Sequence, residues 1–110
     1  MSLWKCEVCG YVAEGAEAPK KCPKCGVSAD RFSLIDEATV EKIYRSDKTN
    51  DLHMQLIHLA MKLDATARAG IEDNLDPGCV HVFELAKQYA WEIKQMAKAE
   101  LAGHIAKGKY

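Results

Sequence analysis

Two short cysteine repeats decide the fold of the first third of this chain: Cys6-Glu7-Val8-Cys9-Gly10 and Cys22-Pro23-Lys24-Cys25-Gly26. Each repeat can wrap a tight turn that points both sulfur atoms at one position. The glycine after the second cysteine can take a positive φ, so that backbone N–H groups face the thiolates. Matched pairs of this kind favour a metal site over disulfides or a redox dithiol. We predict one tetrahedral, all-thiolate metal site with four ligands: Cys6, Cys9, Cys22 and Cys25.

The spacing of the cysteines does not choose the metal. Tetrahedral coordination by four sulfurs suits either Zn²⁺ or iron. A structural zinc ribbon and a redox-active iron site therefore both remain open at this point.

The residues around the cysteines extend the pattern. Aromatic side chains stand at Trp4, Tyr11 and Phe32, Gly15 marks a turn, and twelve residues separate the two cysteine pairs. Together, residues 3–35 resemble the short rubredoxin-like domain of rubrerythrins. The resemblance implies that the four cysteines hold one iron with a one-electron Fe(III)/Fe(II) couple. The resemblance therefore favours an electron carrier. Zinc would be a substitute metal in such a carrier, or the native metal if the site is structural.

The rest of the chain departs from that family. Rubrerythrins join this domain to a ferritin-like bundle whose di-iron site uses Glu-x-x-His motifs. No glutamate in residues 36–110 is followed three positions later by histidine, and the cysteine ribbon comes first rather than last. We therefore expect no peroxidase centre and no catalytic residues.

The composition separates two regions. Residues 1–35 are rich in turn formers, and so small a domain usually requires a metal to fold. From residue 36 the pattern becomes helical, with expected helices over about 37–46, from about 50 to 69, and over 77–106. Gly70 is the predicted stop of the second helix, and Asp76-Pro77 the predicted start of the third. The predicted fold class is α+β, a metal-binding β-ribbon (1–35) followed by a helical hairpin (36–110).

The expected hairpin is apolar over more surface than one partner helix can cover. The second helix carries two neighbouring stripes, and the last helix carries one: Leu52, Leu56, Leu59 and Leu63; Met54, Ile57, Met61 and Ala65; Val82, Ala86, Tyr89, Ile93, Met96 or Ala97, and Leu101. We expect the hairpins to pair into a four-helix bundle, as a homodimer or higher assembly. In the alternative, the β-ribbon folds back over the spare face.

Several other residues invite a functional interpretation. In a dimer, His58, His81 and Glu84 would be a second metal site, although they and His53 are more simply helix-surface or interface residues. Cys79 lies in the first turn of the last helix, which would lower its thiol pKa, although a lone cysteine is more often a small buried hydrophobe. His104 and Glu100 are expected to be a solvated pair.

Lysine and arginine residues around the metal loops would either dock an acidic redox partner or form an ordinary solvated surface: Lys20, Lys21, Lys24 and Arg31.

The whole-chain properties limit the function classes. The 110 residues carry a formal net charge of −1, which opposes a nucleic-acid or anionic-membrane role. No apolar run is long enough to span a membrane and no signal peptide is evident, so we expect a cytoplasmic protein. We favour an electron carrier with a reductase and an oxidase or peroxidase as partners. A zinc-ribbon module for protein interaction is the alternative.

Overall fold

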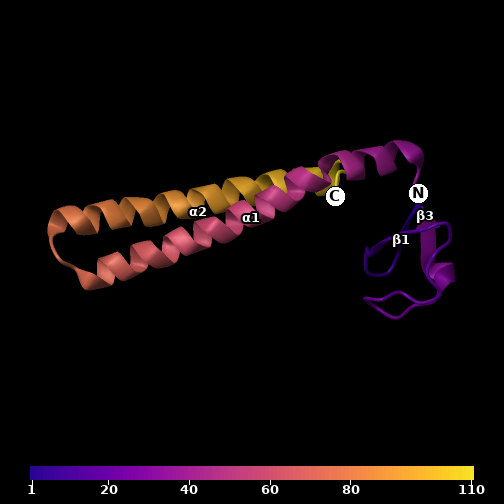
Figure 1. The fold of residues 1–110 in the computed structure, drawn as a ribbon, viewed down its shortest axis with the longest axis horizontal. Coiled ribbons are helices and arrows are strands. Elements are labelled where there is room, and N and C mark those ends of the chain that lie inside the picture. The colour runs from indigo at the N-terminus through magenta and orange to yellow at the C-terminus, as the bar shows by residue number, and fades with distance from the viewer. The chain divides into compact units, whose positions relative to one another are not determined.

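The computed structural model describes all residues, 1–110, and divides into two compact units, Met1–Tyr44 and Arg45–Tyr110. The first unit contains a small sheet, and the second consists of packed helices (Figure 1). The α+β fold class predicted from the sequence is confirmed. Neither helix contains a stretch long and apolar enough to cross a membrane.

Three short antiparallel strands form the sheet of the first unit. Strand β1 (Leu3–Cys6) lies in the centre, between β2 (Val12–Glu14) and β3 (Phe32–Leu34), and a 3₁₀ turn (Ala29–Arg31) precedes β3. Trp4 pairs with Ala13 on one side and with Leu34 on the other. The indole Nε1–H of Trp4 donates to the Gly15 carbonyl at 3.1 Å. This bond ties the strand that leads into the first cysteine pair to the turn that follows β2.

The apolar core of this unit is built around the cysteines. Its buried members are Cys6, Cys22 and Phe32, and half-buried apolar side chains pack against them. Only a few large side chains are enclosed, so little apolar area is available to stabilise so short a chain. The ligands of the predicted metal site are thus also the centre of the core.

Helix α1 runs without interruption from Glu37 to Asp73. The Asp36 carboxylate caps its start by accepting hydrogen bonds from the Thr39 backbone N–H at 3.0 Å and the Thr39 hydroxyl at 2.8 Å. The predicted break after residue 46 is wrong. Ser46 and Asn50 lie in the segment predicted to interrupt the helix, but both are buried and donate to the Lys109 carbonyl at 2.6 and 2.7 Å.

The predicted stop at Gly70 is also wrong, because α1 ends three residues later. Asn74 takes the left-handed conformation there, with φ 48°, and its N–H donates to the Gly70 carbonyl. Asparagine is one of the few residues that adopt this conformation readily. Gly70 has a different role, because a Cβ at that position would overlap the ring of Phe83.

Helix α2 spans Pro77–Ala106, as predicted, and Asp76 caps it by accepting from the Cys79 N–H at 2.8 Å. It packs antiparallel to α1 (Figure 1). The contact between them consists mainly of small residues, and its fully buried apolar members are Ala60, Ala67, Ala90 and Ala97. Small residues let the two helix backbones approach closely.

The predicted apolar stripes match this contact only in part. Ile57 and Ile93 are half-buried, and Ala97 is buried, but the leucines of the first stripe are exposed. The seam on α1 instead includes the polar residues Ser46, Asn50 and Asp64. Asp64 is kept there by hydrogen bonds from Arg68 Nε at 2.8 Å and Trp91 Nε1 at 3.1 Å.

Candidate metal centre

Two loops of the same design present the cysteines. In the first, the Cys6 N–H donates to the Tyr11 carbonyl, and the Gly10 N–H donates to the Cys6 carbonyl at 2.9 Å. In the second, Cys22 and Gly26 make the equivalent bonds, the latter also at 2.9 Å. Gly10 and Gly26 have φ angles of 82° and 81°, a region that residues with a Cβ rarely adopt. The positive φ predicted for both glycines is confirmed.

The loops bring the four sulfur atoms together. All four lie within 4.8 Å of one another, with Cys6 Sγ 3.7 Å from Cys25 Sγ and Cys9 Sγ 3.6 Å from Cys22 Sγ. A disulfide would require about 2.05 Å, and none is present. A tetrahedron with metal–sulfur bonds of about 2.3 Å has sulfur–sulfur edges of about 3.8 Å. The sulfur positions therefore fit a single tetrahedrally coordinated ion.

The backbone of each loop is turned towards its first sulfur. Cys6 and Cys22 each accept hydrogen bonds from the backbone N–H groups two and three residues further along. Cys9 accepts one from the Tyr11 N–H. These donors stabilise negative charge on sulfur, which a thiolate-ligated ion requires.

The thiol pKa values show the balance of burial and hydrogen bonding. Burial raises the pKa of Cys6 and Cys22, but the N–H donors and neighbouring thiols outweigh it. The net pKa of Cys6 is lowered, and that of Cys22 falls to about 6. For Cys9, the Tyr11 N–H lowers the pKa, but burial and the other thiols together raise it to about 11. Cys6 and Cys22 therefore ionise readily, whereas Cys9 keeps its proton until a cation binds.

Comparison with known proteins identifies this unit. The family model for the rubredoxin-like domain of rubrerythrin matches residues 4–33. Rubrerythrin of Clostridium perfringens is 70% identical over 35 residues, which are 32% of this chain and 18% of the relative. These residues form a rubrerythrin-type rubredoxin-like domain.

The similarity extends beyond the rubredoxin-like domain in one relative. Reverse rubrerythrin-1 of Clostridium acetobutylicum is 34% identical over 82 residues, which are 74% of this chain and 40% of that protein. Rubrerythrin of Nitratidesulfovibrio vulgaris is 47% identical over 32 residues, 29% of this chain and 17% of the relative. The chain therefore spans well under half the length of these relatives. No solved structure matches it.

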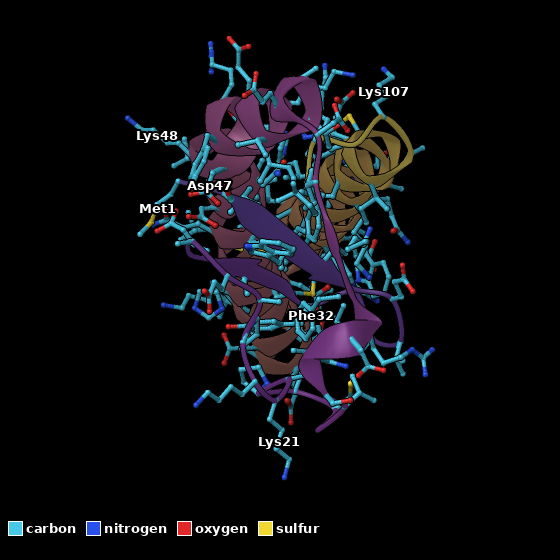
Figure 2. The ribbon with its side chains drawn as sticks, turned by 90° about the vertical axis from the view of Figure 1, so that its right-hand side faces the viewer. Met1, Lys21, Phe32, Asp47, Lys48 and Lys107 are labelled. Carbon is cyan, nitrogen blue, oxygen red and sulfur yellow. The ribbon has the colours of Figure 1, made fainter.

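The four cysteines of the rubredoxin-like domain differ in their access to solvent. Cys6 and Cys22 are buried, Cys9 is half-buried, and Cys25 is exposed. The exposed lysines Lys20, Lys21 and Lys24 belong to the loop that carries Cys25, and Figure 2 shows Lys21 extending outward from the ribbon. The site therefore meets solvent at one edge, beside a group of positive charges.

The histidines outside the rubredoxin-like domain form no comparable ligand set. The four cysteines are the only group of three or more potential ligands that the structure assembles. His58, His81 and Glu84 are exposed and are not joined within one chain. His104 does not pair with Glu100 as expected, because its Nδ1 lies 2.5 Å from Asn50 Oδ1. No local sequence pattern indicates this contact, because it joins residues 54 positions apart.

Cys79 behaves differently from the sequence prediction. The thiol is half-buried, and its hydrogen bond to Asp76, followed by burial and the charge of Asp73, raises its pKa. The lowered pKa expected at a helix start is wrong, because the capping carboxylate outweighs the helix terminus. This makes Cys79 a poor nucleophile.

Proposed function

We propose that the protein is a one-electron carrier that uses a mononuclear iron held by Cys6, Cys9, Cys22 and Cys25. The observation that supports this most strongly is the tetrahedral sulfur cluster within a rubrerythrin-type rubredoxin-like domain. Iron in such a site supplies a one-electron Fe(III)/Fe(II) couple. The alternative, a structural zinc that staples an interaction module, is supported by the same sulfur positions.

The loops contribute rigidity and charge compensation to this function. The sheet, the Trp4–Gly15 hydrogen bond and the two glycine turns fix the sulfur positions. A site whose ligands stay in place in both oxidation states needs little reorganisation. The backbone N–H groups that point at the sulfurs stabilise the additional negative charge of the reduced state, whereas burial opposes it. The reduction potential follows from this balance.

The exposed edge of the cluster is the proposed place of electron exchange. Cys25 is exposed, and residues 18–29 contain three lysines and no acidic residue. A redox partner with an acidic surface would be attracted to this edge, most strongly at low salt. The partners we propose are a reductase and an oxidase or peroxidase. A cytoplasmic location suits a chain in which none of the five cysteines forms a disulfide.

A potentiometric titration tests the carrier function. The iron-loaded protein should bleach and recolour reversibly, with one electron per chain. Cys79→Ser should leave the spectrum and the titration unchanged, because Cys79 lies outside the cluster, whereas Cys9→Ser should abolish the wild-type spectrum. A site that takes up no electron over the accessible range of potential would favour the structural alternative.

A further inference from the structure

One side of the helical hairpin is left uncovered. The contact between α1 and α2 is filled mainly by small residues, with Ala60 and Ala67 buried on α1 and Ala90 and Ala97 buried on α2. Several larger apolar side chains of both helices therefore remain outside it.

On α1 the uncovered side is a stripe of four leucines. Leu52, Leu56, Leu59 and Leu63 are each 40–52% exposed. Each directly precedes a buried or half-buried residue at positions 53, 57, 60 and 64. Along one helix, the residues that directly precede the successive contact residues all lie on the same flank of the contact. The leucines therefore follow one flank of the hairpin over three turns.

On α2 the same flank is also apolar. Val82, Tyr89 and Met96 are seven residues apart and 51–63% exposed, and each precedes a residue that faces α1. In an antiparallel pair, positions that precede the contact on both helices lie on the same side. The Asp64–Trp91 and Asn50–His104 contacts set a register that places Leu59 level with Met96.

Charge is distributed unequally between the two flanks. On the leucine flank, α1 has no charged residue between Thr49 and Thr66. On α2, this flank carries Glu92 at the outer edge and Glu100, which directly precedes the half-buried Leu101. On the opposite flank, charged residues are frequent: Asp51, Arg68, Lys87, Lys94 and Lys98. An apolar flank with few charges on an otherwise charged helical pair is the pattern of a buried interface.

We propose that this flank binds a second copy of the chain, so that two hairpins form a four-helix bundle around a two-fold axis. The seven apolar side chains are each 40–63% exposed and form one continuous patch, and a stable interface buries roughly 800 Å² of each partner. A two-fold axis places each surface against itself, and the leucine stripe of α1 carries no charged residue that would meet its own copy there. An unpaired patch of this size would be unusual on a monomer.

Analytical ultracentrifugation of the metal-loaded full-length chain tests the proposal. The wild type should sediment as a dimer at micromolar concentration. Leu59→Lys should raise the dimer dissociation constant by at least about 100-fold, because the cation lies in the centre of the flank. Met54→Lys is the matched control on the same helix, since Met54 is 43% exposed but lies on the opposite flank, and it should remain dimeric.

A second variant distinguishes loss of the dimer from misfolding of the chain. Val82→Lys should also dissociate the dimer while the helical circular dichroism stays unchanged. The proposal is overturned if the wild type is a monomer at high concentration, which would mean that another part of the chain covers the flank. It is equally overturned if Met54→Lys dissociates the dimer as strongly as Leu59→Lys.

Discussion

At the scale of single residues, the metal site depends on groups whose roles follow from their immediate neighbours in the sequence. A cysteine pair, the glycine after it and the N–H groups between them lie within five consecutive residues, so their geometry follows from local turn chemistry. The sequence therefore predicts the site in detail. Asn50 and His104 could not be predicted in this way, because each role depends on a residue more than 50 positions away.

The role of Gly70 also depends on a residue that is distant in the sequence. Its sequence context is typical of a helix end, but it makes room for Phe83, a neighbour that only the hairpin brings close.

We expect Gly70→Ala to destabilise the hairpin by about 1–3 kcal/mol, because the added methyl group displaces the Phe83 ring. Gly103→Ala is the control, since a Cβ there meets nothing within 4 Å. It should stabilise α2 by about 0.5–1 kcal/mol through helix propensity. Urea denaturation followed by helical circular dichroism compares the two, and equal stabilisation by both alanines would contradict the packing role.

The lysines beside Cys25 give a second prediction at this scale. Lys24→Glu should slow oxidation of the reduced protein by the anion ferricyanide by about 3–10-fold at low salt. Its effect should vanish near about 0.5 M salt, where screening is short-ranged. Lys48→Glu, on an exposed position of α1 (Figure 2), should have little effect. Stopped-flow absorbance measures both, and equal slowing by the two variants would show that only net charge matters.

At the scale of the elements, α2 was predictable and α1 was not. The start of α2 carries its signal locally, as an Asp-Pro pair that caps the helix. The middle of α1 contains cap-like residues that would interrupt an isolated helix. There, the Lys109 carbonyl satisfies Ser46 and Asn50 from outside, so the helix continues. Tertiary hydrogen bonds override the local preference in this segment.

The carboxylate of Asp64 makes the stability of the hairpin depend on pH. The hydrogen bond from Arg68 lowers the pKa of Asp64 and outweighs the opposing effect of burial. The charge of Arg68 and the hydrogen bond from the Trp91 indole lower this pKa further. A carboxylate with a lowered folded pKa stabilises the fold above its unfolded value of about 3.9 and loses this effect as pH falls through the folded pKa. We therefore expect the melting temperature of the hairpin to fall as the pH drops below about 4.

Thermal melts of the wild type and Asp64→Asn from pH 6 to pH 2 check this expectation. The variant should melt lower at neutral pH and show a smaller fall on acidification. Acid release of the metal is common to both proteins and cancels in the comparison. Asp51→Asn, at an exposed position of α1, should follow the wild type. Parallel pH profiles for Asp64→Asn and the wild type would rule out the proposed linkage.

At the scale of the whole molecule, the two units are stabilised in different ways. The first unit has a core centred on the metal ligands, and the second has a helical contact without any of them. We therefore expect metal removal to unfold the first unit and to leave the hairpin folded.

The two tryptophans report this separately. The Trp4 indole N–H bonds to Gly15 in the first unit, and that of Trp91 bonds to Asp64 in the second. After chelation under reducing conditions, the Trp4 indole resonance should collapse to an unfolded position in the proton NMR spectrum, while the Trp91 resonance persists. Loss of both resonances together would show that the units fold as one.

The proposed electron transfer depends on a redox-active iron held by the four cysteines. The most direct measurement is the metal content and visible spectrum of protein isolated at native expression levels without chelator, before and after dithionite. We expect about one iron per chain and a red colour that bleaches on reduction. One zinc per chain and a colourless protein at native levels would contradict it, and would make the site structural.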